Sequence, residues 1–262
     1  MKSRYLVPEL MDDPGLDANV HRQALDGLRR INRISRTAST IARKIIQYSN
    51  DLRLPTARIL DLGCGCGDVA YGVAKLLPKH GDWQIEGWDI SPTAIDYARQ
   101  LYGDDPALAS LVSRNPKISL SNDRTRSVVA DASITSQSML SFHQQDVFQA
   151  EGPPFDFVYC SLFLHHFSDS DAIRVLRRMR DLARHVLIVD DLNRSRMGYW
   201  MARIGVRLLS RSPIVHFDGP QSVRAAFSMS EVKPLARAAG LSNVTLESRW
   251  PGRWLLAAEL YR

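Results

Sequence analysis

The chain has 262 residues, of which 45% are hydrophobic and 24% are charged, as in ordinary globular proteins. Its length suits one large α/β domain or two small ones, and its composition excludes global disorder, collagen-like repeats and coiled coils. No apolar run approaches the roughly 20 residues that a membrane-spanning helix needs. The first residues also lack the apolar core of a signal peptide, so we expect a cytoplasmic protein.

The 34 basic residues outnumber the 28 acidic residues, which gives a net charge of +6. This excess is concentrated between Arg174 and Arg211, where ten arginines stand against three aspartates. Such a patch attracts nucleic acid, anionic lipid or an acidic substrate, although solvated helix faces carry similar charge. We find no RNA-binding motif in the sequence and therefore expect no nucleic-acid partner.

The cysteines are Cys64, Cys66 and Cys160, an odd number that argues against a disulfide framework. Structural zinc sites have four Cys or His ligands, with cysteine pairs spaced by two or more residues. The pair Cys64-x-Cys66 does not fit this spacing, and we expect no metal site.

The predicted elements alternate between helices and strands after a helical N-terminal region. In residues 18–50, leucine and isoleucine recur at three- and four-residue steps, which predicts one or two amphipathic helices. The helix that follows Ser91-Pro92 begins with a typical N-cap and first-turn pair. The remaining elements are strands over 58–62, 83–90, 139–147, 155–164 and 186–190, helices over 67–77 and 169–182, and a terminal hairpin over 244–250 and 254–260. This alternation predicts a doubly wound, mostly parallel sheet.

The chain divides into a predicted N-terminal helical cap, residues 1–55, and a main domain, residues 56–262. Residues 103–138 are rich in Ser, Asp and Arg and are expected to be a surface insertion. Residues 193–229 are expected to be a lid or substrate segment. Its apolar helix over 195–211 carries arginines on one face, which suits a lid over a hydrophobic substrate or an interfacial helix on a membrane. The alternative is a helix that simply packs on the domain.

The most informative segment is the glycine-rich loop Asp61-Leu62-Gly63-Cys64-Gly65-Cys66-Gly67, between a predicted strand and a predicted helix. Its glycines permit a tight turn and close approach of a ligand, and the helix that follows presents free N–H groups. A dinucleotide site requires G-x-G-x-x-G, whereas this loop reads G-x-G-x-G after an acidic residue. A nicotinamide cofactor is therefore the least expected ligand.

This loop resembles motif I of the class I S-adenosylmethionine-dependent methyltransferases. The resemblance implies a Rossmann-like, seven-stranded, mostly parallel sheet with a C-terminal antiparallel hairpin and N-terminal helices. It also implies that S-adenosylmethionine is the cofactor, with its methionine part beside Asp61, Gly63, Cys64 and Gly65.

Two further acidic residues follow the glycine loop at the ends of predicted strands. The resemblance places Asp89 at the ribose hydroxyls of the cofactor and Asp146 at the adenine amino group. Asp89 also follows Gly67 at nearly the spacing of the ribose-binding acid in dinucleotide sites. Further cofactor contacts are expected from residues beside these strand ends and the end of strand 155–164: Ile90, Val147, Cys160 and Ser161.

Methyl transfer to a hydroxyl group requires a base, and histidine is suited to this role near neutral pH. His165 and His166 follow strand 155–164, and alternation along a strand brings only one of them into the pocket. We select His166 because it lies further toward the loop. His216, with Asp218 as a possible orienting partner, is the second candidate. Either histidine could instead be structural, His166 in packing or capping and His216 in an ordinary loop.

More loosely, the chain resembles small-molecule methyltransferases of the ubiquinone/menaquinone type. The segments Asp190 to Arg194 and Asp218 to Arg224 resemble bacterial methyltransferases of polyketide and phenolic-lipid pathways. The resemblance implies methyl transfer to a small aromatic or lipid-like acceptor, on oxygen or carbon, with peripheral membrane contact as a further expectation. Two alternatives stay open: a methyltransferase acting on RNA or protein, and an inactive scaffold that binds the cofactor.

Overall fold

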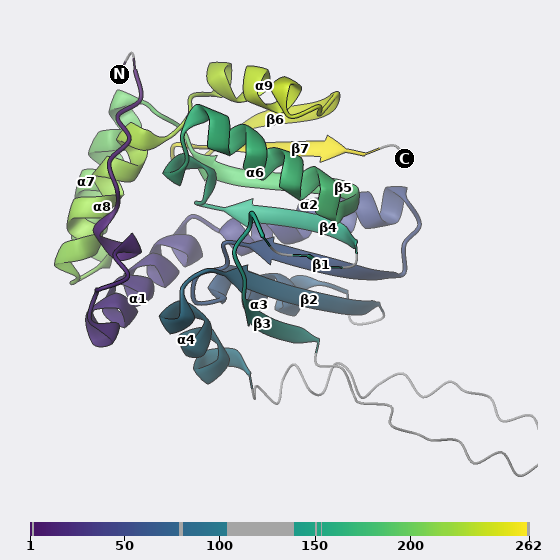
Figure 1. Cartoon of the computed structure of the whole chain (residues 1–262), viewed down its shortest axis with the longest axis horizontal. Coiled ribbons are helices and arrows are strands. Elements are labelled where there is room, and N and C mark those ends of the chain that lie inside the picture. The colour runs from purple at the N-terminus through teal and green to yellow at the C-terminus, as the bar shows by residue number, and fades with distance from the viewer. Residues whose placement is uncertain (2, 79–80, 104–138, 150, 153, 261–262) are drawn as a thin grey trace, which may run out of the picture.

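The computed structural model describes the whole chain except residues 2, 79–80, 104–138, 150, 153 and 261–262 (Figure 1). The described strands form one seven-stranded sheet in the order β3-β2-β1-β4-β5-β7-β6. The strands are β1 (Thr56–Leu62), β2 (Asp82–Asp89), β3 (Leu140–Gln144), β4 (Phe155–Ser161), β5 (Ala183–Leu192), β6 (Asn243–Arg249) and β7 (Arg253–Glu259). Pairing is parallel from β3 to β5, and β7 pairs antiparallel with both β5 and β6. The predicted fold class is confirmed.

Several helices begin at a residue whose side chain caps the first turn. Asp17 accepts hydrogen bonds from the N–H groups of Asn19 and Val20, and Ser91 accepts one from Ala94 at 3.2 Å. The helices are η1 (Leu10–Asp12), α1 (Ala18–Ile34), α2 (Thr37–Asp51), α3 (Asp68–Leu76), α4 (Pro92–Tyr102), η2 (Leu164–His166), α6 (Asp169–Leu182), α7 (Arg196–Leu209), α8 (Pro213–Ala225) and α9 (Met229–Ala238). None of them is long and apolar enough to span a membrane in the described part of the chain.

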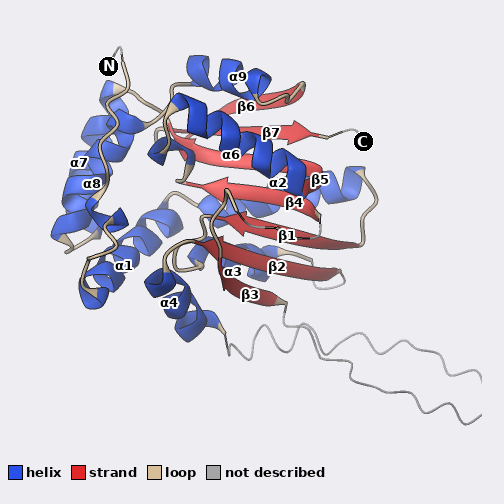
Figure 2. Ribbon diagram, in the orientation of Figure 1, coloured by secondary structure: helices blue, strands red, loops and turns tan. Residues whose placement is uncertain are grey.

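Two apolar layers sandwich the sheet, as the period-2 pattern of its buried strands requires. In β5, Val186 and Ile188 pack on the side of α2, α3 and α4, whereas Leu187 and Val189 pack on the side of α6 and α9. Figure 2 shows α6 in front of the sheet and α2 and α3 behind it. Because α2 supplies Ile41 to this core, the second half of the predicted N-terminal cap lies directly on the sheet.

The carboxyl ends of the parallel strands point toward α7, α8 and the N-terminal segment, as the arrowheads of β4 and β5 show (Figure 1). We use the name N-terminal segment for residues 3–12. Arg4 Nη2 donates hydrogen bonds to the carbonyls of His165 (3.3 Å) and Phe167 (2.8 Å), just beyond β4. The N–H group of Leu10 donates to Asp218 in α8 at 2.9 Å. The first residues of the chain therefore lie over the edge where ligands bind in open α/β sheets.

Three predictions differ from the structure or fall outside it. The strand predicted over 155–164 ends at Ser161, because Leu162 has a φ of +52° and leaves the extended conformation. His216 lies in a helix rather than a loop: α8 begins with Pro213, whose fixed φ suits a first helical position. The predicted insertion 103–138 lies outside the described residues beyond Gly103.

Candidate functional site

The glycine loop follows β1 and takes a backbone path that other residues rarely adopt. Gly63, Gly65 and Gly67 have φ values of +71°, +53° and +75°. A Cβ atom on Gly63 would lie 2.4 Å from the Phe163 ring, and one on Gly67 would lie 2.3 Å from the Phe142 ring. The turn therefore requires glycine at both ends, for conformation and for space. Its contact with Phe163 places the loop beside η2.

Asp89 connects the end of β2 to this loop. Its carboxylate accepts hydrogen bonds from the N–H groups of Gly65 (2.8 Å) and Ser91 (2.9 Å). Burial raises the pKa of this carboxyl above its usual value. A Cβ on Gly65 would meet only the Leu25 side chain at 3.8 Å, so the loop is open at this point. Ile90, directly after Asp89, is exposed.

Asp61 lies at the base of the loop with a buried carboxylate. Neither carboxylate oxygen has a hydrogen-bond partner of acceptable geometry among the described residues, and neither does the hydroxyl of Tyr159 nearby. Burial raises the pKa of Asp61 well above the usual value, although the adjacent Tyr159 hydroxyl opposes this. A buried carboxylate without a partner is costly, so its position beside a ligand loop fits a donor group on that ligand.

Asp146 follows β3 and stands near the same edge as Asp89. Its carboxylate accepts a hydrogen bond from the N–H of Phe148 at 2.9 Å, which holds the turn after the strand. The neighbouring Val147 is buried against Trp88 and other core residues of the α6 side. The order of acids along the sheet edge is therefore the one that the sequence predicts.

Cys64 and Cys160 are predicted cofactor contacts, and their side chains lie in the core. Both thiols are buried, and Cys160 Sγ lies 3.8 Å from Met179 Sδ beneath α6. Burial raises the pKa of both thiols well above the usual value, so they are inert as nucleophiles. Only their backbone groups are available to a ligand at the edge. Ser161, the last residue of β4, is partly exposed and pairs with Asp190.

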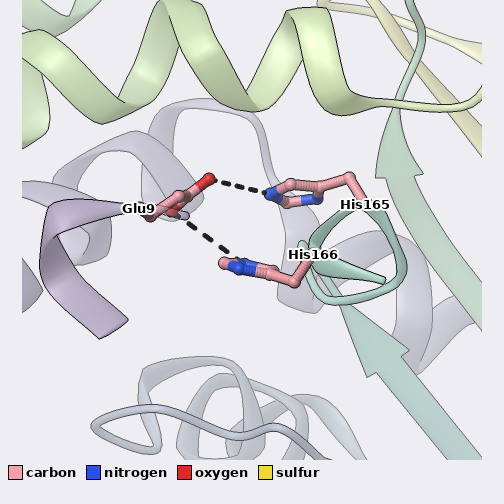
Figure 3. Close-up of side chains that lie close together, drawn as sticks. All are labelled: Glu9, His165 and His166. Carbon is pink, nitrogen blue, oxygen red and sulfur yellow. Dashed lines mark ion pairs between the residues drawn. The ribbon is translucent and has the colours of Figure 1, made fainter. Parts of the chain in front are cut away.

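Two histidines of η2 meet a glutamate of the N-terminal segment at this edge (Figure 3). His165 is almost fully buried; its Nδ1 lies 2.7 Å from Asp191 and its Nε2 lies 3.4 Å from Glu9. Burial opposes the charged imidazole, but Asp191 and Glu9 outweigh burial and raise the pKa of His165 to about 10. His165 is therefore held between two carboxylates.

His166 is the more accessible of the two rings. Its Nδ1 lies 2.9 Å from Asp12, and its Nε2 lies 4.0 Å from Glu9. Burial lowers the pKa of His166, but Glu9 and Asp12 outweigh this and raise it. Burial alone would raise the pKa of Glu9, yet the two imidazoles and the Ser222 hydroxyl lower it to about 2. We call Glu9, His165 and His166 the histidine cluster.

The sequence analysis did not identify Glu9, Asp12 or Asp191 as site residues. Nothing in their local pattern distinguishes the first two from surface acids, because more than 150 residues separate them from the histidines. The ligand atoms of the histidine cluster lie within 4.8 Å of one another, a spacing that a metal ion could also use. Carboxylates engage both Nδ1 atoms and Glu9 faces both Nε2 atoms, so the cluster brings acids and imidazoles close enough to share protons.

The second candidate base, His216, has a different environment. Its Nε2 lies 2.7 Å from the Ser210 carbonyl at the junction of α7 and α8. Asp218 does not orient it, since that carboxylate accepts hydrogen bonds from Leu10 (2.9 Å) and Met11 (3.1 Å). Asp218 therefore holds the N-terminal segment on α8.

A cavity of about 630 Å³ lies elsewhere, between α1, α2 and α3. It is lined by several arginines of α1 together with Asp68 and Tyr102, and it contains none of the predicted cofactor residues. The chemistry of the glycine loop, rather than this cavity, therefore locates the candidate site.

A sequence profile described as a methyltransferase domain matches residues 28–246, most of the chain. This chain belongs to that methyltransferase family. The methyl donor is S-adenosylmethionine, as the glycine loop implied, and the cofactor or its product is present in structures of similar fold. No curated protein sequence matches the chain.

Solved methyltransferase structures share the fold at low sequence identity. The magnesium protoporphyrin IX methyltransferase from Synechocystis PCC 6803, with bound S-adenosylhomocysteine, is 18% identical with a TM-score of 0.56, covering 94% of this chain and 100% of its own. A putative O-methyltransferase from Nostoc punctiforme PCC 73102 is 17% identical with a TM-score of 0.59, covering 98% of this chain and 64% of its own. An O-methyltransferase family 2 protein from Planctomyces limnophilus DSM 3776, in complex with apigenin, is 16% identical with a TM-score of 0.50, covering 78% of this chain and 49% of its own. At such identities the likeness establishes the fold alone.

Proposed function

We propose that this enzyme transfers the methyl group of S-adenosylmethionine to an oxygen atom of a small aromatic or lipid-like acceptor. The observation that carries the proposal is the position of this cluster beside the glycine loop, at the carboxyl edge of the sheet. Two proteins of similar fold were crystallised with phenolic compounds, apigenin and 1,4-dihydroxy-2-naphthoic acid. Acceptors of this kind offer a hydroxyl proton that a base must remove.

The residues at the edge fit the cofactor. The unpartnered carboxylate of Asp61 suits the cofactor's amino group, and the open loop at Gly65 leaves room for its methionine part. Asp89 at the end of β2 suits the ribose hydroxyls, and Asp146 after β3 suits the adenine amino group. Contacts from Gly63, Ile90, Val147, Ser161 and the backbone of Cys64 and Cys160 complete the proposed set.

Calorimetric titration with S-adenosylmethionine, with NADH as the control ligand, tests this assignment. Asp89→Ala removes the proposed ribose contact, and we expect the affinity to fall at least about tenfold, the effect of losing a hydrogen bond to a charged group. Asp96→Ala, an exposed aspartate of α4, is the matched control and should bind as the wild type does. Binding of NADH in place of S-adenosylmethionine would exclude the assignment.

Bound S-adenosylmethionine supplies an activated sulfonium methyl group, so the protein has to align the acceptor, exclude water and accept a proton. We propose that His166 accepts the acceptor's hydroxyl proton at Nε2. Glu9 stabilises the resulting imidazolium, and Asp12 holds the ring at Nδ1. His165 is too enclosed between Asp191 and Glu9 for direct contact, and we assign it the role of positioning Glu9.

Turnover with a panel of long-chain and simple phenols tests the role of His166. We expect His166→Ala to reduce kcat about 10²- to 10⁴-fold, the usual contribution of a general base. His185→Ala is the control, because His185 lies at the amino end of β5, beside Asp156. Full activity of His166→Ala would indicate that the methyl group goes to carbon or that another residue is the base, with His216 as the next candidate. Methyl transfer to RNA, with binding that falls steeply with salt, would support the alternative substrate class.

A further inference from the structure

Helix α7 carries an apolar stripe that no part of the described chain covers. Met197, Trp200, Ile204 and Leu208 follow one another at three- and four-residue steps, so they share one side of the helix. Their exposed fractions are 67%, 59%, 58% and 78%. The opposite side of α7 packs on the protein through Gly198 and Val206. Large apolar residues that are exposed in a row, rather than singly, indicate an interaction surface.

Arginines follow the apolar stripe along its whole length. Arg196, Arg203 and Arg207 each directly precede a residue of the stripe, so they form a parallel row about 100° around the helix. Neither these arginines nor Arg211 forms an ion pair within the described part of the chain. No acidic residue occurs between Leu192 and Phe217. The surface therefore combines apolar side chains with uncompensated positive charge.

A second exposed indole lies next to the first turn of α7. The turn between β6 and β7 contacts this end of the helix: the N–H of Asn193 donates to the Gly252 carbonyl at 2.8 Å. A Cβ on Gly252 would lie 3.5 Å from the Cα of Gly198. Trp250 in this turn is 73% exposed. Indole rings and arginines are the side chains that occupy the boundary between lipid headgroups and acyl chains.

We propose that α7 binds the surface of an anionic lipid bilayer, with the apolar stripe inserted among the acyl chains and the arginines at the headgroups. The row of arginines complements anionic phospholipids, and the stripe provides the apolar area that a soluble anionic ligand would not need. This proposal does not depend on which acceptor is methylated.

The bound orientation brings the candidate site to the lipid surface. Helix α7 packs on α8, and α8 holds the N-terminal segment through Asp218 and Ser222 (Figure 1). The carboxyl edge of the sheet therefore lies directly behind the membrane-facing helix.

Co-sedimentation of the full chain with vesicles tests the proposal. We expect binding to vesicles of equal parts phosphatidylcholine and phosphatidylglycerol, and much weaker binding to phosphatidylcholine alone. Leu208→Glu should weaken binding at least about tenfold, because a charge replaces an inserted side chain. The double variant Arg203→Gln, Arg207→Gln should bind about thirtyfold more weakly and show a shallower dependence on salt, since two arginines near an anionic surface together contribute about 2 kcal/mol.

Leu76→Glu is the matched control, because Leu76 is an exposed leucine on α3, away from α7. It should bind vesicles as the wild type does, and thermal melting should show that every variant is folded. Equal binding of Leu208→Glu and wild type, or no binding of the wild type to either vesicle, would overturn the proposal. A wild-type dimer that Leu208→Glu dissociates, without vesicle binding, would instead assign the stripe to self-association.

Discussion

The most unusual residue in the described structure is Glu9, which faces two imidazoles at once. Its carboxylate lies 3.4 Å from His165 Nε2 and 4.0 Å from His166 Nε2. A charged group in such a buried position is stabilised only by opposite charge and hydrogen bonds, and Glu9 has both. The same contacts favour the charged imidazoles. The N-terminal segment, together with Asp191 of β5, therefore raises the proton affinity at the acceptor side of the site.

The substitution Glu9→Gln should lower the pKa of both histidines, because it removes a negative charge and keeps the side-chain size. We expect NMR titration of the imidazole protons to show the pKa of His165 clearly below the wild-type value of about 10. The pKa of His166 should move in the same direction. Unchanged values for His165 and His166 would contradict the assigned role of Glu9.

This shift has a consequence for stability. A histidine whose pKa is raised on folding contributes stability that is fully present below its unfolded value of 6.5 and is lost as pH rises through its folded value. The wild type should therefore lose free energy of unfolding between about pH 6.5 and 10, and Glu9→Gln should lose less over this range. Urea unfolding at a series of pH values measures the difference.

At the scale of elements, one buried charge network joins the terminal hairpin to the helical layer. Asp190 in β5 is fully buried and forms ion pairs with Arg249 of β6 and Arg253 of β7, the latter at 3.1 Å. Arg253 also reaches Ser35 and Thr37, between α1 and α2. These contacts hold together segments that lie far apart in the sequence. The antiparallel hairpin is thereby fixed to the parallel part of the sheet by charge as well as by the strand ladder.

Replacing Asp190 by alanine should destabilise the protein by about 3–5 kcal/mol, since the buried guanidinium of Arg253 and the partly buried one of Arg249 then lose their counter-ion. Chemical denaturation gives this value directly. Lys44→Ala is the comparison, because Lys44 pairs with the exposed Glu247 of the same hairpin at 2.8 Å. An exposed pair contributes at most about 1 kcal/mol. Similar losses for the two variants would mean that Asp190 is not essential to the hairpin.

At the scale of the whole molecule, the N-terminal segment covers the carboxyl edge of the sheet. Arg4 anchors it: the guanidinium donates to the carbonyls of Ala225 (2.6 Å) and Phe167 (2.8 Å), pairs with Asp169, and lies 3.5 Å over the Phe227 ring. Arg4 thus connects the N-terminal segment both to the residues after η2 and to the end of α8.

The substitution Arg4→Ala should weaken the attachment of the N-terminal segment and leave the sheet intact. We expect the amide protons of Leu10 and Met11, which Asp218 now holds, to exchange faster with solvent by at least about tenfold. Amides of β4 and β5 should keep their protection, because their ladders do not involve Arg4. Hydrogen exchange with mass spectrometry resolves the two regions, and faster exchange throughout the chain would indicate global destabilisation instead.

Much of this protein could be predicted from its sequence. Short apolar runs indicated the buried strands, and capping residues such as Ser91 marked helix starts. The glycine loop with Asp61, Asp89 and Asp146 identified the methyltransferase family. These signals are local, because capping residues, glycine turns and runs of apolar residues are patterns of near neighbours in the chain.

Only the tertiary structure decided which side chains meet at the acceptor side. Glu9 and Asp12 reach the histidines across more than 150 residues, and no periodic pattern records a contact of that range. Cys160 is buried because α6 packs over it, and the α7 stripe is exposed because no described segment covers it. The sequence by itself therefore determined the fold and the cofactor. Tertiary packing determined the proton affinities and the exposed surface, because both depend on long-range neighbours.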